Sequence, residues 1–439
     1  MARSLLQPGA SVQQVPDSFI HWFRFAAPYL QKHRDATFVI ALPGEAAAHP
    51  NFLNLAQDLS LLQSLGARLI LVQGARAQID AALTAVGIDA PLEAGVRVST
   101  AAAMPHIIAA TNAVRTELER ALSAGLLGAP RLRTVSGNFV VAKPVGVRDG
   151  VDYLLTGLVR QVDRQAIERA LYGGALAIVP TLGFSATGEV FNLSLGDCAT
   201  QVAKAVGADK IIALLGEQRL RPLLEQQSVV LPARAQQLAA VEMGEAGLLH
   251  AVAAAVDAGI ERAHLVSYEA NGALLRELFT HDGAGLLIAR QEPVQVRTAS
   301  AADVGYILEL IQPLQESGVL VQRSRELLEA ELDRFAVLDI DGTAIGCAAL
   351  HPLDEQAAEI ACVAVQPEFQ GRGYAGRLLE FQEQRAIAAA IKRLFVLSTQ
   401  ATHWFIERGY RETPADDLPA ARRAQYSTER KPRVLVKLL

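Results

Sequence analysis

The chain has 439 residues, 51% of them hydrophobic and 20% charged, with a formal net charge of -5 at pH 7. This length exceeds the roughly 100 to 200 residues of one domain and predicts two or three folding units. The mild negative charge argues against a general attraction to nucleic acid. No apolar run approaches the roughly 20 residues that span a bilayer, and the first residues lack a secretory signal. We therefore expect a cytoplasmic protein without nucleic-acid or membrane partners.

The first part of the chain predicts an α/β domain over residues 18–290. Residues 1–17 are expected to form a tail, and HWFRFAAPYLQKHR is expected to form an amphipathic helix with an apolar face that includes Trp22 and Tyr29. Apolar strand-like segments then alternate with helical ones. They are TFVIAL, ARLILVQG, GALAIVPTLG, DKIIALLG and RAHLVSYE. Such alternation is typical of an αβα sandwich with a mostly parallel sheet.

A second domain with a mixed sheet is predicted over residues 295–439. The strand VQVRTAS leads into a Ser-Ala-Ala-Asp helix start, and a second helix is predicted in RSRELLEAELDRF. A hairpin with an Asp341-Gly342 turn follows, because Asp-Gly between apolar runs is a strong hairpin signal. The strand EIACVAV, a glycine-bearing turn, a long helix, the strand RLFVLST and the helix THWFIERG complete the order.

The most informative segment is CVAVQPEFQGRGYAGR, residues 362–377, in which an apolar strand breaks into a glycine-bearing turn and a helix. Backbone N–H groups at a helix start favour phosphate. Gln370, Gly373 and Ala375 match the Gln/Arg-x-x-Gly-x-Gly/Ala signature, so the domain resembles the GCN5-related N-acetyltransferases. The resemblance implies that acetyl-CoA is held by Cys362, Val363, Ala364 and Val365 and by Gln370, Gly371, Arg372, Gly373, Tyr374 and Ala375.

Acetyl transfer to an amine needs a base for the ammonium proton and an acid for the leaving thiolate. Glu359 is the candidate base; by a period of two it should share one face with Ala361 and Val363, and the alternative is an edge residue that points to water. The tyrosine acid found in many of these enzymes is replaced by Phe405. Ser398 is the nearest hydroxyl to substitute for it, with strand-end packing as the alternative.

Basic residues in two separated groups suggest an acceptor with two carboxylates, because arginine binds carboxylates in a bidentate manner. One group is Arg323 and Arg325. The other comprises Arg422, Arg423, Arg430 and Lys431. The alternative for each is a solvated surface residue.

Residues 18–439 resemble the bacterial N-acetylglutamate synthases, which join an amino-acid-kinase-like domain to an acetyltransferase domain. The resemblance rests on LLQSLGARLILVQGARAQID, VSGNFVVAKPVGVRDGVDY, GALLRELFTHDGAG and HWFIERGY, among others. It implies acetyl transfer from acetyl-CoA to the α-amine of L-glutamate, with Arg323, Arg422 and Arg430 on the glutamate carboxylates, Glu359 as base and Ser398 as acid. Pro432 departs from the serine common in the family, and this substitution removes both a hydroxyl and a backbone N–H donor.

Kinase chemistry is expected to be lost from the first domain. The first strand is followed by Pro43 and Gly44 without the lysine that phosphoryl transfer needs, and the glycine cluster after the next strand is reduced to Gln73 to Arg76. The resemblance implies instead that this domain binds arginine as an effector. The candidate residues are Glu277, which would bind the guanidinium, and Tyr29, Lys210, Gly283 and Gly285, with packing or turn roles as the alternatives.

The resemblance also implies a homo-oligomer, a hexamer in this family. No metal is expected, since Cys198, Cys347 and Cys362 form no paired ligand motif. Three other functions stay open: an acetylglutamate kinase or bifunctional synthase-kinase, a protein-lysine acetyltransferase with an amino-acid-sensing domain, and a protein that only binds arginine.

Overall fold

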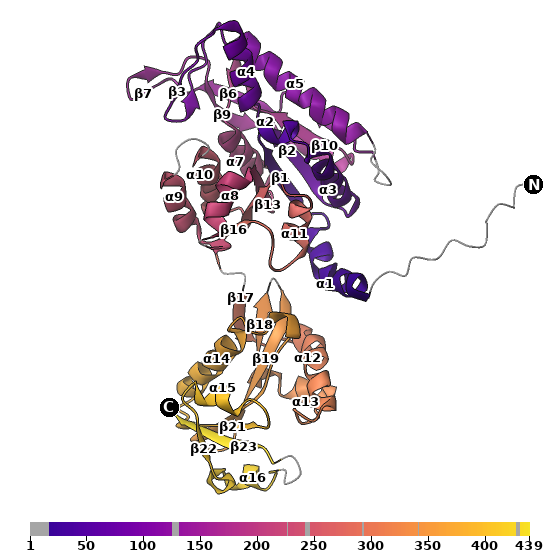
Figure 1. Cartoon of the computed structure of the whole chain (residues 1–439), viewed down its shortest axis with the longest axis vertical. Coiled ribbons are helices and arrows are strands. Elements are labelled where there is room, and N and C mark those ends of the chain that lie inside the picture. Colours follow the sequence, from indigo (N-terminus) through magenta and orange to yellow (C-terminus); the bar gives the residue numbers. More distant parts are fainter. Residues whose placement is uncertain are drawn as a thin grey trace, which may run out of the picture. The chain divides into compact units, whose positions relative to one another are not determined.

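The computed structural model describes residues 17–124, 131–225, 227–241, 246–291, 294–340, 342–426 and 431–439. The chain divides into two compact units, Met1–Gln291 and Glu292–Leu439 (Figure 1). Residues 1–16 of the predicted tail lie outside the described residues, as do Asp341 and Arg430. Within the described residues, no helix is both long and apolar enough to cross a bilayer.

The first unit is built on an eight-stranded sheet in the order β14-β16-β15-β13-β1-β2-β10-β5. All neighbouring pairs are parallel except β15 and β16. The strands are β1 (Thr37–Leu42), β2 (Arg68–Gln73), β5 (Thr134–Ser136), β10 (Leu176–Pro180), β13 (Lys210–Leu215), β14 (Val229–Val230), β15 (Arg262–Ser267) and β16 (Leu286–Ala289). The predicted mostly parallel sheet is confirmed.

Helices cover both faces of this sheet, with α3 and α5 on one side and α7 and α10 on the other (Figure 1). The described helices are α1 (Asp17–His33), α2 (Gly44–Ala48), α3 (Phe52–Ser64), α4 (Arg76–Val86), α5 (Met104–Ser123), α6 (Arg164–Tyr172), α7 (Leu195–Val206), α8 (Glu217–Leu224), α9 (Pro232–Val241), α10 (Ala246–Asp257) and α11 (Ala273–Phe279). Phe38, Ile40 and Leu42 of β1 pack in one core, and Val39 and Ala41 pack in the other. Such a strand is continuously apolar because both of its faces are buried.

A smaller four-stranded sheet and two hairpins lie beyond the carboxyl ends of the main strands. The small sheet has the order β12-β11-β6-β9. Its strands are β6 (Val140–Pro144), β9 (Gly157–Val162), β11 (Leu182–Phe184) and β12 (Val190–Asn192), and the hairpins are β3 (Leu92–Glu93) with β4 (Val96–Arg97) and β7 (Val147–Arg148) with β8 (Val151–Asp152).

The second unit contains a seven-stranded mixed sheet in the order β17-β18-β19-β20-β21-β23-β22, antiparallel except for β20 and β21. Its strands are β17 (Val294–Thr298), β18 (Phe335–Ile340), β19 (Thr343–Pro352), β20 (Ala357–Val365), β21 (Arg393–Ser398), β22 (Arg411–Thr413) and β23 (Arg433–Leu438). Its helices are α12 (Val304–Glu316), α13 (Arg325–Ala330), α14 (Tyr374–Ala388), α15 (Thr402–Ile406) and α16 (Ala420–Arg423), with 3-10 turns η1 (Ala301–Asp303), η2 (Leu332–Arg334), η3 (Pro367–Phe369) and η4 (Ala415–Asp417).

The predicted helix start after β17 is confirmed. Ser300 and Asp303 form a capping box, in which the Ser300 backbone N–H donates to Asp303 Oδ2 over 2.7 Å. The carboxylate also receives two hydrogen bonds from Arg297. The hydrogen bonding by Arg297 has the largest effect and the hydrogen bonds from Ser300 add to it, and together they lower the pKa of Asp303 to about 2. The start of the 3-10 turn η1, which runs directly into α12, is therefore stabilised by a charged cap at neutral pH.

A β-bulge interrupts β20. Ala361 pairs with Ala349 and Ala364 pairs with Cys347, so Cys362 and Val363 together face one residue of β19. Cys362 has a φ of 54°, in the left-handed region that few non-glycine residues adopt. As a result, Ala361 and Cys362 pack on the same core, whereas Val363 packs against the opposite one. The prediction that Val363 shares a face with Glu359 and Ala361 is wrong, because the bulge shifts the alternation by one residue.

Candidate active site

The glycine-bearing turn before α14 has the geometry of an anion cradle. Gly371 and Gly373 have φ values of 79° and 80°, and a Cβ at either position would have no atom within 4 Å. The backbone conformation, and not lack of space, therefore requires glycine. Within the described residues, no hydrogen bond leaves the N–H groups of Gly371, Gly373 or Ala375. These donors lie at the positive end of a 15-residue helix.

The turn is hydrogen-bonded to β20. The edge of β20 that is predicted to hold acetyl-CoA separates from the neighbouring strand β21. Gln370 donates from Nε2 to the carbonyl oxygen of Val365 over 2.9 Å. The parallel ladder to β21 involves only Ala357 to Glu359. Beyond Glu359 the two strands diverge, at the residues where the bulge occurs. An extended thioester arm can lie along such an opened edge and accept main-chain hydrogen bonds.

Beside this edge lies a pocket with a volume of about 550 Å³. Three residues predicted from separate parts of the sequence, Arg323, Glu359 and Arg422, line it together. Cys362 at the bulge and Pro432 from the tail also contribute. Arg430 lies outside the described residues, so its predicted contact with a carboxylate stays a prediction.

Glu359 and Arg422 form a bidentate ion pair inside the pocket. Arg422 donates from Nη2 to Glu359 Oε1 over 3.1 Å and from Nε to Glu359 Oε2. The side chains are only 9% and 18% exposed, respectively. The hydrogen bonds to Glu359, opposed by burial, raise the pKa of Arg422. The candidate base and one candidate substrate ligand therefore neutralise each other in this structure.

Arg323 belongs to a second polar group that sequence reasoning missed. It donates from Nη1 to Glu331 Oε2 over 3.0 Å and from Nη2 to His351 Nε2 over 3.1 Å. His351 lies directly opposite Glu359 in the β19–β20 ladder. Burial, followed by the charge of Arg323, lowers the pKa of His351 to about 4, so this ring is neutral at pH 7 and accepts from Arg323. Buried Nε of Arg323 has no partner within the described residues.

The candidate acid Ser398 ends β21 and does not line the pocket, although its neighbour Leu397 does. Its Oγ accepts the Ala401 N–H over 2.9 Å, which leaves the hydroxyl proton available for donation. Phe405, at the position of the usual tyrosine, is 5% exposed and packs edge-on against Trp404 and Tyr410. Phe405 therefore has a packing role.

Both units match known families. Residues 36–217 match the amino acid kinase family, and residues 305–410 match the acetyltransferase (GNAT) family. An amino-acid acetyltransferase of Azotobacter vinelandii is 45% identical over 431 residues, which are 96% of this chain and 99% of that one. An amino-acid acetyltransferase of Pseudomonas aeruginosa is 44% identical over 97% of this chain and 100% of its own length. The chain belongs to the amino-acid acetyltransferase family.

Solved structures agree with this assignment. The N-acetylglutamate synthase of Neisseria gonorrhoeae in complex with coenzyme A and L-arginine is 36% identical, with a TM-score of 0.87 over 96% of this chain and 100% of that one. The same gonococcal enzyme in complex with coenzyme A and N-acetyl-glutamate is 35% identical over the same shares, with a TM-score of 0.59. The predicted fold, an amino-acid-kinase-like domain followed by an acetyltransferase domain, is confirmed.

In this amino-acid acetyltransferase, two of the predicted effector residues, Gly283 and Gly285, lie beside the buried carboxylate of a third, Glu277. Glu277 accepts from His264 Nδ1 over 2.6 Å and from the N–H groups of Ala284 and Gly285 over 2.8 and 2.7 Å. A Cβ at Gly283 would lie 2.5 Å from Glu277 Oε2. Burial opposes the charge of Glu277, but these hydrogen bonds outweigh it and lower its pKa.

Two histidines complete this region of the acetyltransferase and were not predicted. Burial, followed by the charge of Lys210, lowers the pKa of both His33 and His264, that of His33 to about 3. His33 Nε2 lies 2.8 Å from the carbonyl oxygen of Leu278, and its ring stands 6.5 Å from that of Tyr29. Of the predicted residues, Glu277 therefore contacts His264 directly, whereas Tyr29 lies near His33 and the charge of Lys210 acts on both rings. No group of three or more metal-ligating side chains is found within the described residues.

Proposed function

We propose that the protein transfers the acetyl group of acetyl-CoA to the α-amine of L-glutamate. The observation that carries this proposal is that Arg323, Arg422 and Glu359 line one pocket beside the opened edge of β20. Two guanidinium groups match the two carboxylates of glutamate, and a carboxylate lies near the place where the amine must enter. The gonococcal N-acetylglutamate synthase, similar over nearly the whole chain, supports the choice of substrate.

The donor site fits acetyl-CoA. The N–H groups at the start of α14 can hold a pyrophosphate, and the β20 edge can align the pantetheine arm and polarise the thioester carbonyl. These roles fall to the predicted residues from Cys362 to Val365 and from Gln370 to Ala375. The bulge at Cys362 turns the backbone at the point where the thioester would lie.

Glutamate binding would open the ion pair of Glu359 and Arg422. A substrate carboxylate that binds Arg422 takes the place of Glu359, whose oxygens then become available to remove a proton from the substrate ammonium, directly or through one water. The neutral amine attacks the thioester carbon, and the carbon–sulfur bond breaks. Ser398 would supply the proton to the departing thiolate and regain one from the second proton that the amine nitrogen loses as the amide forms. The same displacement would thus form the recognition contact and release the base.

The test is coenzyme A thiol release with glutamate, compared with aspartate, glutamine, ornithine and a lysine-containing peptide. Glutamate should give the highest kcat/KM, and Arg323→Met should raise the KM for glutamate at an unchanged KM for acetyl-CoA. Activity with ornithine or peptide but not with glutamate would refute the two-carboxylate argument. Consumption of ATP with N-acetylglutamate would support the kinase alternative.

We also propose that the first unit binds arginine as an effector, through the region of Glu277, Tyr29 and Lys210. A guanidinium is complementary to a buried carboxylate that already has its charge stabilised by hydrogen bonds. The gonococcal relative was solved with L-arginine. Arginine should change the acetyltransferase rate and the melting temperature, and Tyr29→Phe and Glu277→Gln should weaken both responses. If arginine changes neither the acetyltransferase rate nor the melting temperature of the unchanged protein, the effector site is refuted.

A further inference from the structure

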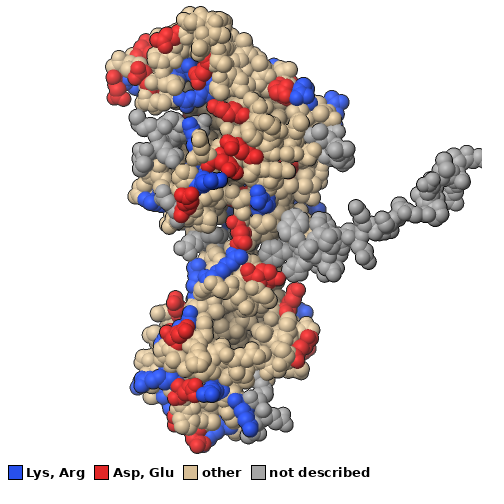
Figure 2. Space-filling view, in the orientation of Figure 1, with Lys and Arg blue, Asp and Glu red and all other residues tan. Residues whose placement is uncertain are grey.

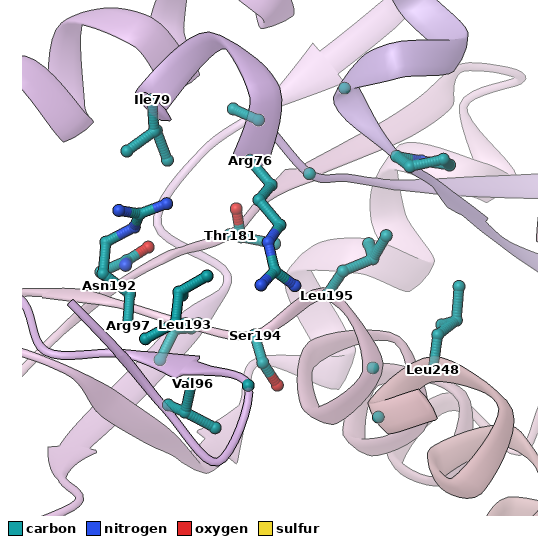
Figure 3. Close-up of a pocket in the computed structure, with 18 of the residues that line it drawn as sticks. Arg76, Ile79, Val96, Arg97, Thr181, Asn192, Leu193, Ser194, Leu195 and Leu248 are labelled. Carbon is teal, nitrogen blue, oxygen red and sulfur yellow. The ribbon is translucent and has the colours of Figure 1, made fainter. Parts of the chain in front are cut away.

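Arginines that line a pocket can be held by neighbouring side chains or left to reorient, and this chain contains both kinds. A pocket of about 350 Å³ at the carboxyl ends of β1, β2 and β10 of the first unit shows the difference (Figure 3). Its Arg97 pairs with Asp80 and donates to the carbonyl oxygen of Ala90 over 3.1 Å. Arg76 extends over the space from the start of α4 and has no ion pair within the described residues. An arginine that is already held loses less side-chain freedom when a ligand binds, so the contacts of Arg323 in the acetyltransferase pocket are informative.

Three side chains surround the guanidinium of Arg323. Glu331 Oε2 accepts from Nη1 over 3.0 Å, and His351 Nε2 accepts from Nη2 over 3.1 Å. The ring of Phe335 lies 6.0 Å from Cζ of Arg323, within the range of a cation–π contact. The side chains of Arg323 and Glu331 are 16% and 19% exposed. Glu331, His351 and Phe335 together form the Arg323 clamp.

The partners of His351 determine which of its nitrogens accepts. Arg323 can only donate, and a neutral imidazole has one acceptor nitrogen. Arg334 Nη1 also approaches the ring, at 3.4 Å from Nδ1, but the shorter contact of Arg323 assigns the acceptor to Nε2. The proton is then on Nδ1, which lies 3.8 Å from Glu331 Oε2. Burial, followed by the charge of Arg323, lowers the pKa of the ring to about 4, so this neutral form is present at pH 7.

The clamp holds Arg323 in an orientation that the side chain alone would not keep. Its Nε is buried without a partner within the described residues, and a buried donor without a partner is costly. The contacts with Glu331 and His351 offset this cost, because hydrogen bonds from a charged donor are strong. In the same orientation each terminal nitrogen of Arg323 keeps a second N–H for a ligand. Without the clamp the guanidinium would turn toward water.

Glu331 differs from Glu359, which the substrate is proposed to displace. Within the described residues the carboxylate of Glu359 binds only Arg422. Glu331 is bound on its other oxygen, Oε1, by Arg334 Nη1 over 2.6 Å. The main-chain carbonyl oxygen of Arg334 in turn accepts from Arg385 of α14 over 3.2 Å. Glu331 is therefore anchored and stays on Arg323 when a substrate carboxylate arrives.

We propose that Glu331 and His351 are positioning residues that hold Arg323 ready for a carboxylate of the acceptor amino acid. Glu331 would repel that carboxylate, and the acceptor nitrogen of His351 has no proton to donate to it. Both residues therefore act through the guanidinium and not through the substrate. The inference rests on the proposed function, since it requires an acceptor that bears a carboxylate.

The test is steady-state release of coenzyme A by the full chain, with the KM for glutamate and the KM for acetyl-CoA measured separately. His351→Leu and Glu331→Gln should each raise the KM for glutamate about tenfold and leave the KM for acetyl-CoA unchanged. His351→Gln, whose amide oxygen can accept from Arg323, should bring the KM for glutamate back to within about threefold of the parent. Glu329→Gln, at a 51% exposed side chain, is the control and should change nothing. Circular dichroism and the urea midpoint verify that each variant is folded.

A double variant separates positioning from direct contact with the substrate. In an Arg323→Met background, His351→Leu should cause no further rise in the KM for glutamate, because a positioning residue acts only through Arg323. A full tenfold rise in that background would overturn the inference. So would a His351→Gln variant as impaired as His351→Leu, or an unchanged KM in both His351→Leu and Glu331→Gln while Arg323→Met raises it. These outcomes leave the proposed function intact.

Failure of the proposed function gives a different result. No turnover of glutamate by the unchanged protein would refute that function, and the same variants are then compared on the acceptor that is turned over. If that acceptor bears a carboxylate, the same pattern of KM values supports the Arg323 clamp. An acceptor without a carboxylate would refute both.

Discussion

Removal of the guanidinium of Arg422 is expected to destabilise the second unit by about 2 to 3 kcal/mol. Loss of one partner from a buried ion pair typically costs about 3 to 5 kcal/mol, because the other charge stays desolvated. The side chains of Arg422 and Glu359 are 18% and 9% exposed, so some solvent reaches the pair and a value below that range is expected. Arg422→Met keeps most of the apolar stem and removes the charge.

The two tryptophans, Trp22 and Trp404, allow each unit to be followed separately. In a Trp22→Phe background, Trp404 fluorescence reports urea unfolding of the second unit alone. Arg423→Met is the matched control: Arg423 is 48% exposed, its Nη1 lies 3.9 Å from the Asp416 carboxylate and donates to the Asp416 backbone carbonyl oxygen over 3.1 Å. Its removal should therefore cost no more than about 1 kcal/mol.

A double variant isolates the ion pair. Glu359→Gln combined with Arg422→Met removes both charges and should regain stability to within about 1 kcal/mol of the parent, while acetyl transfer stays lost. If Arg422→Met costs no more than Arg423→Met, or if the second substitution gives no recovery, the ion pair does not stabilise the unit as argued.

Three further outcomes are expected. Glu359→Gln should lower kcat with glutamate at pH 7 by about a hundredfold or more at an unchanged KM for acetyl-CoA; retained kcat would exclude it as base. Gly373→Ala, at a φ of 80°, should cost roughly 1 to 2 kcal/mol and raise the KM for acetyl-CoA, unlike Gly376→Ala in the helix; equal KM values would refute the cradle. Folding lowers the pKa of His351 from 6.5 to about 4, so the unfolded chain binds the extra proton between these values. Stability should therefore fall by up to about 3 kcal/mol as the pH drops from 6.5 to 4, and His351→Gln should remove that part of the fall; an unchanged pH slope would be contrary to this assignment.

The regular parts of the fold could be predicted because they depend on local patterns. Buried parallel strands such as TFVIAL are apolar throughout, and the turn with Gly371 and Gly373 requires backbone angles that glycine supplies. Charge patterns were informative only in part. Acidic and basic side chains are interspersed over the visible face of the chain (Figure 2), so a sequence cluster such as Arg422 and Arg423 does not reveal which member enters a pocket.

The rest depends on contacts that are distant in sequence. Glu359 and Arg422 are 63 residues apart, and their pairing follows from the position of α16 relative to β20. The bulge at Cys362 has no compositional signature, since a period of two continues on either side of it. His264 and Glu277 come together only after β15 and α11 pack. The polar Arg76, Thr181 and Asn192 likewise meet at strand ends that are far apart along the chain.

All three thiols of the chain are free and buried: Cys198 in the first unit, and Cys347 and Cys362 in the second. Burial raises the pKa of each of them, and the thiolate is the form that reacts with disulfide reagents. A colorimetric disulfide reagent added during turnover should therefore record the coenzyme A released and almost none of the enzyme. Under denaturing conditions the same reagent becomes a conformational probe. The rate at which Cys198 is labelled reports the opening of the first unit, and the rate at which Cys347 is labelled reports the opening of the second.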